Sequence, residues 1–105
     1  MLERLDKILA RFDEVSALLA DAQVMSDPKK LRELAKEHSE LEEIADKSRE
    51  YKRLLNDCDG TRQLLREATE PEMKELAASE LEELDRKVEQ LEEEIKLLLE
   101  VGSPL

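Results

Sequence analysis

The stretch Glu70-Pro71-Glu72-Met73-Lys74-Glu75-Leu76-Ala77-Ala78-Ser79-Glu80-Leu81 opens a long helix with a regular apolar seam. Beyond Leu76 the apolar residues recur at alternating four- and three-residue steps, at Ala77, Leu81, Leu84, Val88, Leu91, Ile95 and Leu98. This spacing is a heptad seam, which must be covered by another helix. The helix is predicted over residues 70–100, and Gly102-Ser103-Pro104 is its stop signal.

A tight reversal is predicted at residues 68–70, immediately before this helix. Thr69 and Glu72 have the spacing of a capping box, and Pro71 falls in the first helical turn. Because a short reversal between two long helices makes them antiparallel neighbours, the preceding helix should run back along residues 70–100. Met73 lies at the tip of this hairpin, where it either packs across the reversal or anchors a partner.

The preceding helix is predicted over residues 28–67. Asp27 supplies a side-chain cap, and Pro28 takes the first helical position, where its missing N–H costs nothing. Residues 56–61 are mediocre or poor helix formers, yet Leu65 keeps the seam in phase beyond them. We expect one helix with Gly60 as the place for a kink; the alternative is a break with a short extra helix. One apolar stripe is predicted, formed by Leu31, Leu34, Leu41, Ile44, Tyr51, Leu55 and Cys58, with Ala35, Ala45 and Leu54 flanking it.

A third helix is predicted over residues 2–20, and residues 21–27 connect it to the next. Its apolar face is formed by Leu2, Leu5, Leu9, Phe12, Val15 and Leu19, widened by Ile8 and Leu18. The fold class is therefore all-α. The chain is expected to form a single helical domain over residues 1–105, an elongated, coiled-coil-like antiparallel hairpin with the N-terminal helix packed on it.

Composition narrows the class of partner. The 105 residues are 43% charged and 2% aromatic, with a formal net charge of -11. A nucleic-acid binder carries a basic stripe, so direct docking on a DNA or RNA backbone is not expected, nor is binding to an anionic membrane. No apolar run approaches the roughly 20 residues of a membrane span, and the amphipathic N-terminus does not resemble a secretory signal. The single cysteine, Cys58, cannot form a disulfide within the chain, which indicates a cytoplasmic protein. The acidic net charge indicates a protein that attracts basic partner surfaces.

The residue types that carry chemistry do not form a site in the sequence. His38 is the only histidine, so a zinc site lacks a second imidazole, and His38 is predicted to be a partly covered seam residue. Cys58 lies twenty residues further along the same helix, about 30 Å away. A calcium loop with Gly60 at its sixth position would need ligands at Leu55 and Arg66, which cannot supply them. We predict no catalytic, cofactor-binding or metal-binding residues, and a chain that is not an enzyme.

Several segments carry a family resemblance. They are Ser26-Asp27-Pro28-Lys29-Lys30-Leu31-Arg32-Glu33-Leu34 followed by Glu37, His38, Ser39 and Leu41; Tyr51-Lys52-Arg53-Leu54-Leu55-Asn56-Asp57; Glu70 to Ala77 with Glu80 and Leu81; and Leu97-Leu98-Leu99. Together they resemble the N-terminal domain of bacterial peptide chain release factor 1, a class I release factor. The Asp-Pro and Pro-Glu-Met sequences at the helix starts are more specific to this family than the heptad pattern. The segment from Pro71 to Leu81 favours type 1 over the sister factor that reads UGA.

The resemblance implies a role in translation termination. In that family a Pro-x-Thr loop reads stop codons and a Gly-Gly-Gln loop is required for peptidyl-tRNA hydrolysis, and neither motif occurs in this sequence. The resemblance therefore implies a non-catalytic ribosome-docking domain, without the decoding and catalytic domains. Its expected partners are ribosomal proteins near the large-subunit stalk base and the GTPase that recycles release factors.

Two questions stay open at this point. The chain ends Leu99-Glu100-Val101-Gly102-Ser103-Pro104-Leu105 where the family usually continues Leu-Leu-Leu-Pro-Lys-Asp-Pro, which leaves both a fragment and a stand-alone relative open. The alternative function is a structural coiled-coil oligomerisation module unrelated to translation, which would self-associate through an open groove.

Overall fold

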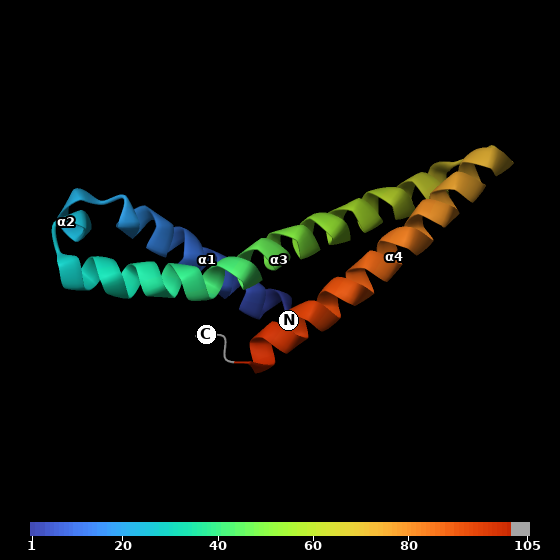
Figure 1. Ribbon diagram of the computed structural model, residues 1–105. Coiled ribbons are helices and arrows are strands. Elements are labelled where there is room, and N and C mark those ends of the chain that lie inside the picture. Colours follow the sequence, from blue (N-terminus) through green and yellow to red (C-terminus); the bar gives the residue numbers. More distant parts are fainter. Residues whose placement is uncertain (102–105) are drawn as a thin grey trace.

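One long central helix organises the computed structural model, which describes residues 1–101 (Figure 1). The helices are α1 (Leu2–Leu19), α2 (Ala22–Met25), α3 (Pro28–Glu67) and α4 (Pro71–Glu100). Figure 1 shows α1 along the first half of α3 and α4 along the second half, and both pack on α3. The molecule measures 63 × 28 × 17 Å. The predicted all-α hairpin with an additional N-terminal helix is confirmed.

The seam of α4 is buried as its spacing predicts. Ala77, Leu84, Leu91 and Ile95 are buried, and the seam residues Leu81, Val88 and Leu98 between and after them are half-buried. α4 ends at Glu100, with Val101 as its C-terminal cap. The predicted stop signal, Gly102-Ser103-Pro104, lies outside the described residues.

The buried side chains of α3 lie on two faces, which corrects the prediction of a single stripe. Leu34, Leu41 and Ala45 belong to the half of α3 that lies along α1, whereas the buried residues from Tyr51 to Thr61 belong to the half that lies along α4. At about 100° of rotation per residue, these two faces are separated by roughly 140°. The rotation explains why Leu54 is buried whereas Leu55, the predicted stripe residue, is only half-buried.

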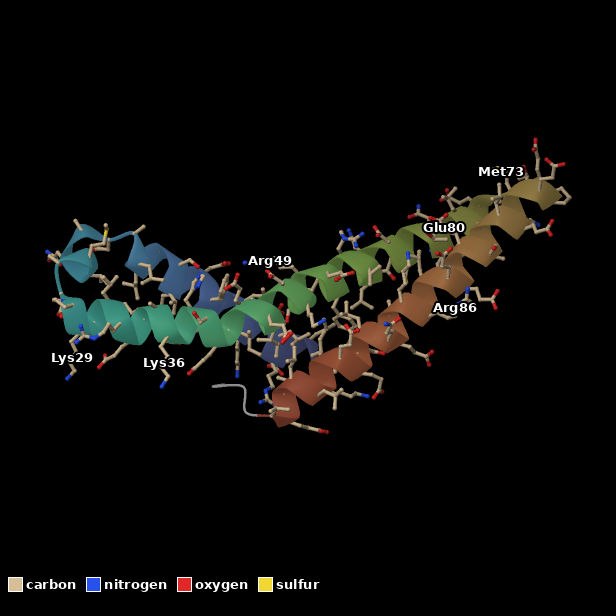
Figure 2. All side chains as sticks on the ribbon, in the orientation of Figure 1. Lys29, Lys36, Arg49, Met73, Glu80 and Arg86 are labelled. Carbon is tan, nitrogen blue, oxygen red and sulfur yellow. The ribbon has the colours of Figure 1, made fainter. Side chains whose placement is uncertain are left out.

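α3 runs without interruption through Gly60, so the predicted alternative of a break and an extra helix is wrong. Figure 1 shows that α3 instead changes direction near its middle, close to Arg49, which is labelled in Figure 2. The fully buried Ser48 donates its hydroxyl hydrogen to the carbonyl oxygen of Ile44, at 2.6 Å. Such a bond to the preceding turn bends helices, so the kink belongs at Ser48 rather than at Gly60.

The ends of the three long helices agree with the predictions within one residue. Two other predictions, for the connection after α1 and for the cap of α4, need correction. The connection after α1 contains an unpredicted single turn, α2, which Asp21 caps by accepting a hydrogen bond from the amide of Gln23 and which buries Val24. The predicted capping box of Thr69 and Glu72 is absent, because the cap residue is Glu70 and no side-chain hydrogen bond is made there. Pro71 takes the first helical position and favours an extended residue before it, so Thr69 lies one residue too early to cap.

The predicted cap at the start of α3 is confirmed. The Asp27 carboxylate accepts a hydrogen bond from the amide of Lys30 at 3.2 Å, and Pro28 is at the start of the helix. In the N-terminal helix, Leu5, Ile8, Phe12 and Val15 are buried, whereas Leu2, which was predicted to share their face, is exposed. None of the helices within residues 1–101 combines the length and the apolar character that crossing a bilayer would require.

Candidate functional site

The two residues with the best side chains for catalysis lie in separate packing environments. The His38 ring stacks on Phe12 with 4.5 Å between ring centroids, which places it in the α1–α3 contact as a partly covered residue. Cys58 lies under α4, where its thiol donates a hydrogen bond to the Asp85 carboxylate at 3.8 Å. Burial, with a smaller contribution from Asp85, raises the pKa of Cys58. A thiol held in its protonated form is a poor nucleophile, so neither residue forms part of a reactive pair.

The acidic residues around Gly60 pair with neighbouring cations of the same helix. Asp57 accepts a hydrogen bond from Arg53 at 3.2 Å, and Asp59 accepts one from Arg62 at 3.3 Å. Within residues 1–101, no group of three or more His, Cys, Asp or Glu side chains is arranged to hold a metal ion. Asp57 and Asp59 therefore act as ion-pair partners along α3.

Polar pairs fix α1 on the first half of α3. The guanidinium of Arg11 forms two hydrogen bonds with the Glu37 carboxylate, at 2.5 and 2.6 Å. Lys52 donates to Asp6 at 2.6 Å. Arg49 lies 5.3 Å from the centroid of the Phe12 ring and, together with Arg11, gives α1 a defined position along α3.

The Arg11–Glu37 pair should make part of the stability depend on pH. Its hydrogen bonds lower the pKa of Glu37, so the stabilisation is complete above the unfolded-state pKa and is lost as the pH falls through the folded-state value. We expect Arg11→Gln to lower the free energy of unfolding by about 1 kcal/mol near pH 7. This difference from the wild type should shrink below about pH 4, near and below the ordinary pKa of a glutamate.

Urea titrations of both proteins from pH 3 to pH 7 measure that difference. Arg53→Gln is the matched control, because Arg53 and Asp57 are both largely exposed and their pair should contribute little. A difference for Arg11→Gln that stays constant with pH would show that Glu37 does not carry the effect.

Polar pairs also link α3 to α4 at the end of the hairpin that lies away from the reversal. Lys47 donates to Glu94 at 3.0 Å, and Tyr51 donates to Glu92 at 2.7 Å. Burial and the hydrogen bond to Glu92 raise the pKa of Tyr51 to about 12, so its hydroxyl remains a donor at neutral pH. Further out, Arg62 lies 3.6 Å from Asp85. These pairs hold the two helices in register toward the reversal.

The hairpin tip, residues 64–76, exposes apolar side chains. Leu64 is 50% exposed, Met73 46% and Leu76 66%. Leu64 and Met73 also line a shallow depression at the reversal, together with Glu67, Ala68, Thr69 and Glu70. Figure 2 shows Met73 at the far end of the molecule, away from α1 and α2. Met73 therefore lies across the reversal from Leu64, yet nearly half of it remains available to a partner.

Sequence reasoning singled out Met73 but missed Leu64 and Leu76. The signal was present, because each of these leucines directly precedes a seam residue, Leu65 or Ala77, and is therefore out of phase with the seam. Exposed apolar side chains that lie together mark contact sites more often than scattered ones do. Four acidic residues accompany them within the tip, at Glu67, Glu70, Glu72 and Glu75, against two cations, Arg66 and Lys74.

Comparison with known proteins gives a consistent result. The PCRF domain model matches residues 8–104. Three similar proteins are each named peptide chain release factor 1. They are 42% identical over 99 residues in Geobacter sulfurreducens, 46% over 99 residues in Brevibacillus brevis, and 43% over 104 residues in Listeria welshimeri. These matches cover 94%, 94% and 99% of this chain, but only 27%, 28% and 29% of the relatives. No solved structure matched.

Proposed function

Because the chain belongs to the PCRF domain family, we propose that it acts in translation termination as a ribosome-docking domain that has no catalytic activity of its own. The chain spans less than a third of the relatives named peptide chain release factor 1. We assign it, over residues 1–105, to the N-terminal domain of such a factor. The Gly-Gly-Gln and Pro-x-Thr motifs of release factors are absent from its sequence, which supports a docking role rather than hydrolysis or decoding.

The observation that carries this proposal is the hairpin tip. It presents Leu64, Met73 and Leu76 at the end of a long two-helix arm, surrounded by an excess of carboxylates. Apolar anchors with charged surroundings are typical of protein–protein contacts. The acidic character favours a basic protein surface, such as ribosomal proteins at the stalk base of the large subunit. The release-factor recycling GTPase is the second proposed partner, and the cytoplasm is the proposed location.

Sedimentation of the chain with purified ribosomes tests the proposal. We expect the wild-type chain to pellet with ribosomes, and the double variant Met73→Ser, Leu76→Ser to bind at least tenfold more weakly, because it removes two apolar anchors. Leu97→Ser is the matched control, since Leu97 is 60% exposed on the same helix but far from the tip. Circular dichroism of all three proteins checks that the helices are retained.

The outcomes of this experiment separate three statements. Failure of the wild-type chain to pellet would contradict ribosome docking. Equal binding by the tip variant and the control would retain docking but exclude the tip as the contact. Peptide release by the chain alone on stop-codon ribosomes would contradict the non-catalytic role.

A further inference from the structure

The start of α3 carries a cluster of cations in an otherwise acidic chain. Residues 28–36 contain four cations, Lys29, Lys30, Arg32 and Lys36, against one acid, Glu33, whereas the whole chain has a net charge of -11. All four cations are exposed. This local reversal of charge is hidden when the net charge is used to exclude nucleic-acid partners.

Three of these cations form a stripe on the face of α3 that points away from α1. At about 100° per residue, Lys29, Arg32 and Lys36 lie within an arc of roughly 60°, opposite the face that buries Leu34 and Leu41. Figure 2 shows Lys29 and Lys36 projecting from the same side of α3, with α1 on the other side. The three residues, which we call the basic stripe, span about 10 Å of helix at 1.5 Å per residue.

Ion pairing within the chain does not account for the basic stripe. Elsewhere on the long helices, several exposed cations pair with acids one turn away, as in Arg53–Asp57, Arg86–Glu82 and Lys96–Glu93. Among the described residues, no ion pair or side-chain hydrogen bond is formed by Lys29, Arg32 or Lys36, although Lys29 has Glu33 four residues ahead. Their charges are therefore available to an external anion.

The position of Lys29, in the first turn of α3, also costs stability. The N-terminal end of a helix carries the positive end of the helix dipole, and cations there are unfavourable by about 0.3–1 kcal/mol each at most. The first turn of α3 contains no acidic residue, and the Asp27 carboxylate at the N-terminal cap is the acid that precedes it. Residues that lower stability without serving the packing of the fold are expected where a ligand is bound.

From these observations we propose that Lys29, Arg32 and Lys36 bind the phosphate backbone of RNA. An acidic polypeptide is the other anionic macromolecule to consider. Protein contacts, however, rely on apolar or aromatic anchors. Met25 of α2 is the exposed large apolar side chain nearest in sequence, and within residues 28–36 there is none. Phosphate contacts need only Lys and Arg at a suitable spacing. The axial length of the basic stripe matches about three nucleotides of one strand.

The choice of RNA rather than DNA rests on the proposed function, because a ribosome presents RNA phosphates beside its proteins. The two ends of the molecule then have different roles. The hairpin tip, with its apolar anchors and acidic surroundings, contacts protein, and the basic stripe near α2 contacts RNA. The bend of α3 near Ser48 sets the direction of one end relative to the other.

Titration of the chain with RNA tests this proposal. Because the titration needs no ribosome, its failure can be distinguished from a failure of the docking proposal. The ¹⁵N-labelled full chain is titrated at low salt with a short RNA hairpin, and its amide shifts are followed. We expect the shifts to concentrate in residues 28–37 and the Kd to rise at least tenfold in the variant Lys29→Gln, Arg32→Gln, Lys36→Gln. The logarithm of the affinity should fall with the logarithm of the salt concentration with a slope of about -2 to -3, as for about three phosphate contacts.

The control variant is Arg53→Gln, Arg86→Gln, Lys96→Gln, which changes the net charge by the same amount using cations that pair within the chain. It should bind the RNA like the wild type. No shift in residues 28–37, or equal weakening in the two triple variants, would overturn the proposal. Equal shifts with a poly-glutamate peptide in place of RNA would also overturn it, in favour of an acidic polypeptide.

Discussion

Replacing Ile95 by alanine is expected to lower the free energy of unfolding by about 2–5 kcal/mol, the range for deletion of a buried aliphatic side chain. Ile95 is completely buried. It belongs to a cluster that contains Leu5 and Ile8 of α1, Leu41 and Ile44 of α3, and Leu84 and Leu91 of α4. The cavity would therefore open where side chains from all three long helices meet. Chemical denaturation followed by circular dichroism measures the loss.

Leu97→Ala provides the control for this prediction. Leu97 lies two residues further along α4 and is 60% exposed, so its truncation should change the free energy of unfolding by no more than about 0.5 kcal/mol. Equal effects for Ile95→Ala and Leu97→Ala would mean that the C-terminal part of α4 is not packed on α3 as described.

Replacing Gly60 by proline is expected to destabilise the protein by about 3 kcal/mol or more. Proline at this position would remove an amide donor from the interior of the uninterrupted α3 and place its ring against the preceding turn. Gly60→Ala should have the opposite sign and stabilise the protein by up to about 1 kcal/mol, because alanine is the better helix former. A Cβ at this position would meet no heavy atom within 4 Å.

The two Gly60 variants should therefore move the melting temperature in opposite directions. A gain of 1 kcal/mol corresponds to an increase of about 4–8 °C for a domain of this size. If Gly60→Pro were tolerated or Gly60→Ala destabilising, α3 would have to be bent at this residue, as expected from the sequence, or broken there, as in the alternative.

Most of the fold could be predicted because a few residues mark the starts of the helices in a strongly periodic sequence. The Asp27-Pro28 pair and Pro71 set the starts of α3 and α4, and the seam from Ala77 to Leu98 required a covering helix. The bend could not be located in this way. Gly60 is a poor helix former, yet it lies on an exposed part of α3, whereas Ser48 bends the helix through a hydrogen bond that exists only once the helix has formed.

Other features escaped prediction because they depend on tertiary packing. The single turn of α2 is too short to show periodicity, and it forms where Val24 packs with Val15 and Leu34. The single stripe predicted for α3 becomes two faces because α1 and α4 cover different sides of it. The basic stripe was visible in the sequence, but the net charge of -11 obscured it. Its significance depends on which exposed cations have partners.

Ribosome docking by this domain is tested most directly by competition with an intact release factor 1 on ribosomes stalled at a stop codon. The isolated chain should slow peptide release in a dose-dependent manner, because it would occupy the same docking site, and it should release no peptide itself. The Met73→Ser, Leu76→Ser variant should compete at least tenfold less well. Unchanged release at concentrations of the chain far above those of the intact factor would contradict docking of this domain on the ribosome.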